Sequence, residues 1–465
     1  MRRFHFVSFI LLLLLALAWV AAASPEAPHL VVISIDGLVP EYYVRPDRLG
    51  LHIPNLRKLT REGAYAEGVI GVYPTVTYPS HTALVTGAKP ADHGIIANSI
   101  FDDPSKPPKR WWYWESSYIK TDTLWAAARR SGLSVASLFW PVTVGADQID
   151  WNIPEIWDPF ADPVFSARVL QEHATPGLLD EILKSQNRSL KGYQHTDESA
   201  VTAAVYVIER YKPNLLLVHL IDLDHTHHEE GPYSGPAFEM VEREDADVGR
   251  ILDAIKRAGI EPSTTVAVVS DHGFMRVDKE FNPSVLLVRE GLIRLNERGR
   301  VVSWEAALHN SGGSAAVYLK KSQDQAVYER VRALFETYTK GPEAPLRQIL
   351  TREELRQLGA NPSAALFLEP AAHFAIGDRL RGPVVEMARE KRRGKHGYLP
   401  ERPEMYASLI LWGRGVRPRA RLELVRMTDV APTLAQVLSI KFQPPDYSRP
   451  LTALLTEAPP TENNK

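Results

Sequence analysis

The order of apolar segments predicts an α/β fold with a central, mostly parallel sheet flanked by helices. Short runs that are apolar at nearly every position are typical of strands buried on both faces. Between them lie longer segments whose apolar residues recur at helical spacing. Strands and helices that alternate in this way favour a parallel sheet. The composition is that of a globular chain, with 24% of the 465 residues charged and 45% hydrophobic.

Five apolar runs are predicted to be buried strands of one parallel sheet: residues 30–35, 135–139, 215–220, 266–270 and 408–412. Four segments with helical spacing are predicted to be its flanking helices: residues 53–62, 123–131, 200–211 and 245–258.

Residues 282–393 have a different pattern. They combine charged helical segments at 325–338 and 352–358 with a Gly-Gly pair and a proline-rich turn. We therefore predict an inserted cap subdomain within one domain that spans residues 28–455. The polar end of the chain, residues 456–465, is predicted to be a flexible tail.

The N-terminus has the pattern of a secretory signal peptide over residues 1–23. Arg2 and Arg3 precede an apolar run at 6–20, and three alanines at 21–23 offer a small-residue cleavage site. An uncleaved anchor is the alternative, because the run approaches the length that spans a bilayer. We expect a periplasmic or secreted protein with no membrane contact beyond this peptide.

The charge balance and the lack of cysteine exclude several kinds of site. The chain has no cysteine, so disulfides, thiolate ligands and thiolate nucleophiles are excluded. A formal net charge of -2 gives no basic surface of the kind that binds a nucleic-acid duplex. Any metal must therefore be bound by His, Asp or Glu.

Carboxylates and imidazoles gather where the predicted strands end. The carboxyl ends of parallel strands form the ligand-binding edge of an open sheet, and carboxylates brought together there repel one another unless a cation binds them. A single Asp in such a place is commonly a helix N-cap, but three with matching histidines favour a metal site. Oxygen and nitrogen ligands suit zinc, with manganese or iron as alternatives. The candidate ligands are Asp36, Asp224, Asp271, His228, His272 and His396.

A hydroxyl residue before a helix is the candidate nucleophile. Thr75 lies in a proline-containing turn, where backbone donors and the helix dipole favour a phosphate. Metal coordination would make its alkoxide accessible near neutral pH. Thr77 and Ser80 are alternatives for the same role.

Six motifs follow one another along nearly the whole mature chain, before a closing segment at 427–434. In order they are Ile35-Asp36-Gly37, Tyr73-Pro74-Thr75, His93-Gly94-Ile95 leading to Asn98, Asp224 with His228, Ser270-Asp271-His272-Gly273, and His396-Gly397-Tyr398. In this order they resemble the type I phosphodiesterase/nucleotide pyrophosphatase family of the alkaline phosphatase superfamily. The resemblance implies an alkaline phosphatase-like fold.

The resemblance also implies two zinc ions and a role for each matching residue. One ion would be held by Asp224, His228 and His396. The other would be held by Asp36, Asp271 and His272, with Thr75 as a further ligand. Thr75 would attack the substrate and form a phospho-threonine intermediate, and Asn98 would donate a hydrogen bond to a phosphoryl oxygen. His225 and His227 are expected to lie behind the ligands or to face solvent.

The substrate is predicted to be a phosphodiester, from a nucleotide or another source. Related monoesterases with a threonine nucleophile place a Lys and an Arg after the strand that corresponds to 135–139, but residues 141–167 contain neither. A phosphomonoesterase or a phosphonoacetate hydrolase is the alternative within the superfamily. A phosphate-binding or metal-binding protein without turnover is the non-enzyme alternative. The aromatic residues 111–114 are expected to pack in the core or cap, with stacking on a base as the alternative.

Overall fold

The computed structural model describes residues 27–107, 109, 112–157, 163–190, 193–390 and 393–456, without the side chains of 163–166. The predicted signal peptide, the predicted tail after its first residue, and Trp111 lie outside this set. Among the described helices, none is both long enough and apolar enough to cross a membrane.

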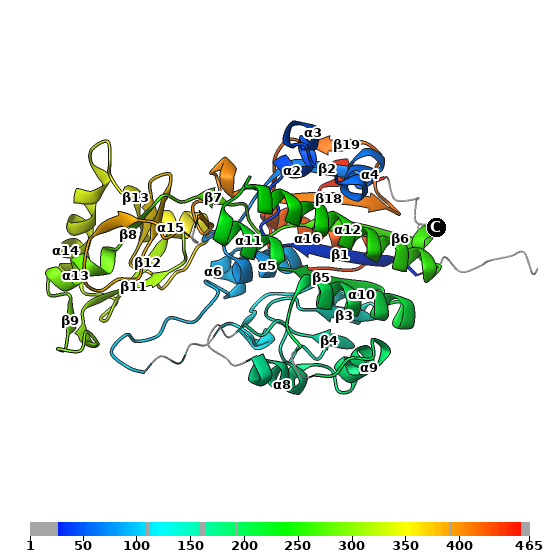
Figure 1. Ribbon diagram of the computed structural model, residues 1–465, viewed down its shortest axis with the longest axis horizontal. Helices are drawn as coiled ribbons and strands as arrows, with labels where there is room; N and C mark the ends of the chain where they lie inside the picture. Colours follow the sequence, from blue (N-terminus) through cyan, green and yellow to red (C-terminus); the bar gives the residue numbers. More distant parts are fainter. Residues whose placement is uncertain are drawn as a thin grey trace, which may run out of the picture.

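A mixed, mostly parallel sheet forms the centre of the molecule (Figure 1). Its middle strand β1 (His29–Ile35) runs parallel to both neighbours, β5 (Leu215–Leu220) and β6 (Thr264–Val269). Beyond β5 lie β3 (Val135–Leu138) and β4 (Trp151–Ile153), also parallel. Beyond β6 lie β18 (Ala407–Gly413), β2 (Ala64–Ile70), β19 (Ala420–Leu422) and β20 (Val425–Arg426).

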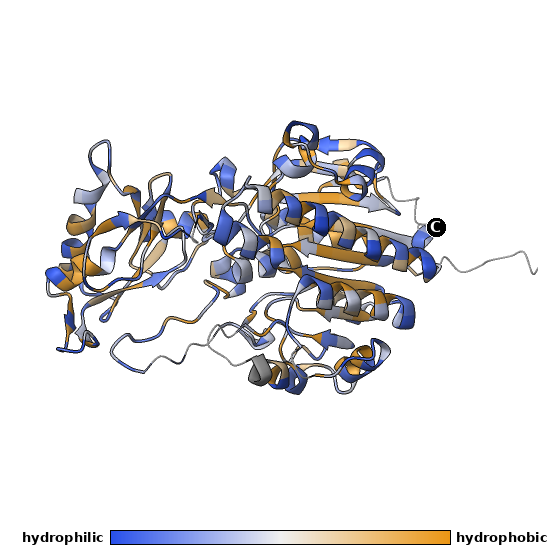
Figure 2. Cartoon of the chain, in the orientation of Figure 1, coloured by the Kyte–Doolittle hydropathy of each residue, from blue (hydrophilic) through white to orange (hydrophobic). Residues whose placement is uncertain are grey.

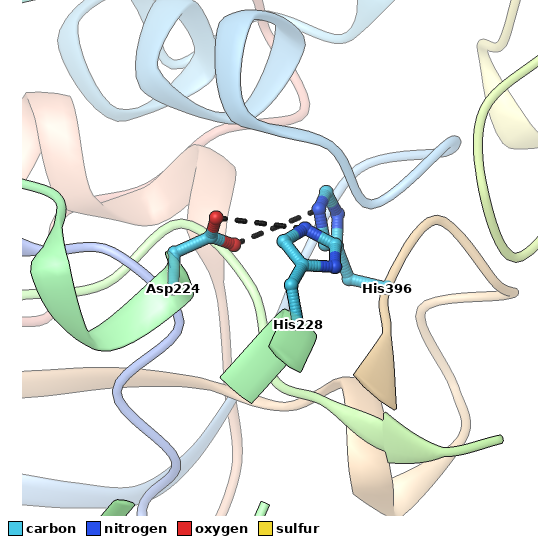
Figure 3. A group of neighbouring side chains, drawn as sticks. All are labelled: Asp224, His228 and His396. Atoms are coloured by element: carbon cyan, nitrogen blue, oxygen red, sulfur yellow. Dashed lines mark ion pairs between the residues drawn. The ribbon is translucent and has the colours of Figure 1, made fainter. Parts of the chain in front are cut away.

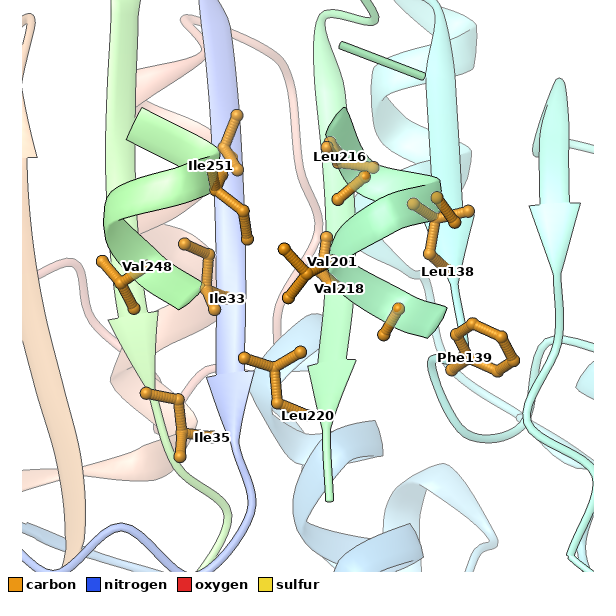
Figure 4. Close-up of a cluster of buried hydrophobic side chains, with 14 of the residues drawn as sticks. Ile33, Ile35, Leu138, Phe139, Val201, Leu216, Val218, Leu220, Val248 and Ile251 are labelled. Carbon is orange, nitrogen blue, oxygen red and sulfur yellow. The ribbon is translucent and has the colours of Figure 1, made fainter. Parts of the chain in front are cut away.

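Helices cover both faces of this sheet because the central strands are apolar on both faces. On one face, Val201 of α10 (Asp197–Tyr211) and Val248 and Ile251 of α12 (Gly235–Arg257) pack over the strands (Figure 4). On the other face the buried cluster includes side chains of α5 (Thr77–Thr86), α7 (Leu124–Arg130) and α16 (Val430–Val437). Figure 2 shows the hydrophobic residues concentrated on the central strands. The α/β prediction is confirmed.

Three of the four predicted helices begin and end within a few residues of the observed ones: α4 (Pro54–Glu62), α7 and α10. The fourth, α12, begins ten residues earlier than predicted. Its first residues, Gly235 and Pro236, are typical of a turn, but proline is tolerated in the first turn of a helix. Ser234 then caps the helix, because its hydroxyl accepts a hydrogen bond from the Ala237 amide.

One predicted strand of the parallel sheet runs in the opposite direction. The segment at 408–412 lies within β18, which pairs antiparallel with both β6 and β2. The physical reason is where the chain re-enters the sheet. β6 ends at the edge that carries Asp271, and the chain returns through His396 at that same edge before β18 begins. A strand that starts there must run antiparallel to β6.

The chain between β8 (Lys279–Phe281) and β16 (Val385–Met387) builds small sheets of its own, on the left of Figure 1. The largest is antiparallel, in the order β11 (Ala306–Asn310), β12 (Ala315–Leu319), β14 (Leu366–Pro370) and β13 (Leu346–Thr351). Helix α13 (Pro283–Arg289) and α14 (Gln325–Glu336) contribute to a separate apolar cluster there, and α15 (Arg352–Leu358) follows β13. The cap bounds at 282 and 393 stay a prediction.

A buried ion pair ties these sheets to the loop that carries His396. Glu369, at the end of β14, is fully buried and accepts hydrogen bonds from Arg402 Nε at 2.7 Å and from the Leu399 amide at 3.2 Å. Its other oxygen accepts from the Tyr73 hydroxyl at 3.3 Å. Burial raises the pKa of Glu369 to about 7 despite the charge of Arg402. Removal of Arg402 would leave a buried carboxyl without its cation.

We predict that Arg402→Met destabilises the protein by about 3–5 kcal/mol, because it breaks a buried pair and leaves one partner. The measurement is the thermal midpoint followed by circular dichroism. Arg356→Met removes one member of an exposed pair with Glu353 and should leave the midpoint almost unchanged. Equal midpoints for the two variants would contradict this account of Arg402.

Candidate metal centre

The first predicted ligand set lies on α11 (Asp222–Glu230) and in the loop after β17 (Gly394–Lys395). Asp224 and His228 are four residues apart on α11, so one helix face presents both. His228 Nε2 lies 3.5 Å from Asp224 Oδ2, and His396 Nε2 lies 3.7 Å from Asp224 Oδ1 (Figure 3). Two histidine nitrogens thus converge on one carboxylate.

The second predicted set lies at the carboxyl ends of the paired strands β1 and β6. Asp36 directly follows β1, and Asp271 and His272 follow β6. His272 Nε2 lies 3.1 Å from Asp271 Oδ2 and 3.4 Å from Asp36 Oδ1. In each of the two sets, one potential ligand atom per residue lies within 4.8 Å of the others.

Backbone carbonyls orient all three candidate histidines. Each ring places Nδ1 within hydrogen-bond distance of a carbonyl: Gly394 for His228, Gly273 for His272 and Thr75 for His396, at 3.1, 3.2 and 3.0 Å. These contacts assign the proton to Nδ1, because a carbonyl can only accept. The Nε2 lone pairs are therefore left facing the carboxylates, as metal ligation requires.

Several buried atoms at this centre have no hydrogen-bond partner within the protein: Asp36 Oδ1, Asp224 Oδ1, Asp271 Oδ2 and His272 Nε2. A buried polar atom without a partner costs free energy. All four are acceptors or lone-pair donors, so one divalent cation in each set would satisfy them. The residues fit two metal ions with nitrogen and oxygen ligands.

Burial and like charges perturb the same groups. Burial, followed by the charge of Asp224, raises the pKa of Asp36 to about 7. Burial, followed by the charge of Asp271, raises the pKa of Asp224 to about 8. Burial lowers the pKa of His396 to about 3. The protein alone therefore disfavours charge on these carboxylates, and a cation would reverse that.

Thr75 lies beside the first set and is fully buried, two residues before α5 begins. Its hydroxyl donates to the Tyr398 carbonyl at 2.8 Å and accepts from the Gly397 amide at 3.1 Å. These contacts hold Oγ1 against the loop of His396. The role of Thr75 as nucleophile and metal ligand stays a prediction.

A cavity of about 170 Å³ opens onto the metal centre. Both Asn98 and Thr77 line it, together with Asp36, Asp224, His228 and His396. Asn98 Oδ1 accepts a hydrogen bond from the Tyr78 amide at 2.9 Å, so its NH₂ group is left as a donor. This orientation suits the predicted hydrogen bond to a phosphoryl oxygen. Ser80 is buried with its hydroxyl unpartnered, and it does not line the cavity.

Sequence reasoning did not find all of the residues around this cavity. Glu155, His195, His219 and Trp157 also line it, and nothing in the sequence linked them to the metal ligands. The sequence feature that could have indicated a role for His219 is its place as a histidine within the apolar strand at 215–220.

The histidines beside His228 differ from one another. His225 lines the cavity, whereas His227 is fully buried and bonds the Tyr42 hydroxyl at 2.9 Å, so it does not face solvent.

Of the aromatic residues 112–114, Trp112 lines the cavity and Tyr113 is buried in a local cluster.

Two sets of potential nitrogen and oxygen ligands at the carboxyl edge of an α/β sheet are the arrangement expected of a protein with two metal sites. The sequence profile of the Type I phosphodiesterase / nucleotide pyrophosphatase family matches residues 30–399. The chain therefore belongs to this family, which is part of the alkaline phosphatase superfamily.

Curated relatives match over part of their length. The human ectonucleotide pyrophosphatase/phosphodiesterase family member 1 is 27% identical over 256 residues, which are 54% of this chain and 24% of that protein. Venom phosphodiesterase 2 of Crotalus adamanteus is 25% identical over 268 residues, which are 55% of this chain and 28% of that protein. The match thus spans about a quarter of the length of these relatives.

Solved structures support the fold. Murine ectonucleotide pyrophosphatase/phosphodiesterase 5 aligns with a TM-score of 0.65 at 20% identity, covering 92% of this chain and 100% of that one. Its inactive threonine-to-alanine variant in complex with AMP aligns with a TM-score of 0.63 at 20% identity, covering 90% and 96%.

The raised carboxyl pKa values predict how pH affects the metal-free protein. Because Asp36 and Asp224 bind protons more tightly when folded, they stabilise the fold at low pH and lose this contribution as pH rises through about 7 and 8. The thermal midpoint of chelator-treated protein should fall between about pH 7 and about pH 8.5. Added zinc should raise the midpoint more at the higher pH, because ligands must be deprotonated to bind it.

Differential scanning fluorimetry with and without zinc measures both effects. Asp224→Asn removes one titrating ligand and should flatten the pH dependence. A metal-free midpoint that rises with pH across this window would contradict the raised pKa values of Asp36 and Asp224.

Proposed function

We propose that this chain is an exported, zinc-dependent phosphodiesterase/nucleotide pyrophosphatase that acts through a phospho-threonine intermediate on Thr75. The observation that carries the proposal is a cavity lined by Asn98, by all three residues of one ligand set and by Asp36 of the other, in a member of this family. Thr75 does not line this cavity, and its hydroxyl lies against the loop that carries His396. The proposed substrates are phosphate diesters and nucleotides that contain a pyrophosphate bond.

Each residue has a defined part in the proposed reaction. Asp224, His228 and His396 would hold one zinc ion, and Asp36, Asp271 and His272 the other. When bound, such a pair stabilises negative charge on the attacking and leaving oxygens. Thr75 Oγ1 leaves its hydrogen bond to the Tyr398 carbonyl, loses its proton to water and attacks phosphorus. The bond to the leaving oxygen breaks, and the leaving oxygen takes up a proton from water. Water then hydrolyses the phospho-threonine and restores the Thr75 hydroxyl.

The cavity lining supports a diester rather than a monoester. Among the described residues, the lining contains no Lys or Arg that would engage the additional charge of a monoester. It does contain Trp112 and Trp157, whose ring centroids lie 6.2 Å apart. An apolar or aromatic substituent of a diester fits against such a wall.

Export rests on the N-terminal pattern of residues 1–23, which lie outside the described structure. We expect cleavage after Ala23, so that the mature protein recovered from outside the cytoplasm begins at Ser24. Intact-mass measurement of that protein tests this. An unprocessed N-terminus on a membrane-bound protein would instead support the anchor.

The activity prediction compares bis-p-nitrophenyl phosphate with p-nitrophenyl phosphate as substrates of the zinc-loaded protein. We expect a higher kcat/KM for the diester. Thr75→Ala should reduce kcat at least about 10³-fold, because the attacking oxygen is removed. Steady-state kinetics with matched zinc content provides the measurement.

Ser80→Ala and Thr77→Ala are the matched controls, since each removes a neighbouring hydroxyl from the same turn and helix. Full activity in Thr75→Ala, together with loss of activity in one of the two controls, would assign the nucleophile to the residue replaced in that control. A preference for the monoester would overturn the substrate class and leave the nucleophile assignment standing. Zinc binding without turnover of either ester would favour a binding protein or a phosphonate substrate.

A further inference from the structure

A line of three buried side chains runs along the sheet edge and ends at the second ligand set. Glu155 Oε2 lies 2.7 Å from His219 Nδ1, and His219 Nε2 lies 3.1 Å from Asp36 Oδ2. The three side chains are only 7%, 1% and 5% exposed, so water does not screen these contacts. Each bond therefore has a strong effect on how its partner is oriented.

The sheet itself places the three groups in line. Strand β5 pairs with β1 so that His219 is opposite Ser34, two residues before Asp36. Strand β4 ends at Ile153, and Glu155 follows at the same edge. Between β4 and β5 lies β3, and the Phe139 carbonyl just after it is 3.3 Å from His219 Nδ1. The line thus crosses the ends of four adjacent strands.

The contact with His219 gives the two carboxylate oxygens of Asp36 different surroundings. Oδ2 is engaged by His219 Nε2, whereas Oδ1 has no partner and lies 3.4 Å from His272 Nε2 within the ligand set. A carboxylate held by one oxygen cannot rotate freely about its Cβ–Cγ bond. The bond to His219 therefore keeps Oδ1 aimed at the position a cation would take.

Glu155 orients His219 through a hydrogen bond, just as His219 orients Asp36. Carboxylate oxygens lie at both ring nitrogens, so the imidazole carries a proton on each of them, and Nδ1 donates to Glu155 while Nε2 donates to Asp36. The bond to Glu155 thereby fixes the plane of the ring. Without it, the carbonyl of Phe139 at 3.3 Å is the weaker remaining acceptor. The ring would then be free to tilt or to change tautomer.

We propose that Glu155 and His219 are positioning residues for Asp36 and that they determine how tightly the Asp36/Asp271/His272 site binds its metal. This inference rests on the proposed metal centre and goes beyond it by assigning two residues that are not ligands. Partners of this kind typically change metal affinity by about 10–100-fold. Among the described residues no hydrogen bond joins this line to Asp224, His228 or His396, so we expect that site to keep its affinity.

The principal test is His219→Phe, which keeps a planar ring and removes both hydrogen bonds. Zinc titration against a chromophoric chelator should show one site unchanged and the other weakened by about 10–100-fold. Cobalt-substituted protein should lose the corresponding part of its visible d–d absorption. Asp271→Asn, which removes a proposed ligand of the weakened site, identifies that part of the spectrum.

His227→Phe is the matched control. His227 is equally buried and bonds the Tyr42 hydroxyl, yet it contacts none of the proposed ligands by hydrogen bond. The same substitution there should leave both metal affinities unchanged. Equal weakening in His227→Phe and His219→Phe would mean a general packing effect and would overturn the proposal.

A second pair of variants decides the question if His219→Phe does not fold. Glu155→Leu removes the acceptor and should weaken the same site about tenfold, whereas Glu155→Gln can still bond Nδ1 and should restore near-normal affinity. Equal affinity in Leu and Gln variants would overturn the role of Glu155. If the protein without substitutions binds no zinc, the proposed metal centre itself is wrong. This outcome distinguishes failure of the metal centre from failure of the positioning role.

Discussion

Mutual repulsion of buried carboxylates is the constraint on which the centre of this protein depends. Asp36, Asp224 and Asp271 lie at one sheet edge with almost no solvent to screen them. Burial raises the pKa values of all three, and it lowers the pKa values of the candidate ligands His228, His272 and His396. Such an arrangement is costly for the protein alone and would become favourable if two cations bound, which would link folding to metal binding.

The path of the chain also brings residues to the sheet edge where these carboxylates lie. After β6 the chain leaves to build the small sheets around β12 and β14, and it returns with His396 to the edge that it left. The Glu369–Arg402 pair holds the returning loop, and that loop in turn holds the Thr75 hydroxyl through Gly397 and Tyr398. One proposed ligand and the proposed nucleophile are thus positioned by contacts with a segment that is remote in sequence.

How far the site could be predicted depends on how local its signal is. Asp36 follows its strand directly, Asp271 follows its strand closely, and Asp224 and His228 share one helix, so adjacency and spacing were enough to single them out. Their grouping into two sets came from resemblance, because spacing alone does not say which Asp meets which His. Glu155 and His219 escaped prediction, since their contact joins residues 64 positions apart across two strands.

The sequence by itself determined the fold class, the ligand types and the strand ends that carry them, because apolar periodicity and residue chemistry are local properties. The tertiary structure decided the direction of β18, the pairing of ligands and the line from Glu155 to Asp36. Those depend on which strands become neighbours and where the chain re-enters the sheet. Pairing across the sheet is a property of the whole fold, and no local pattern encodes it.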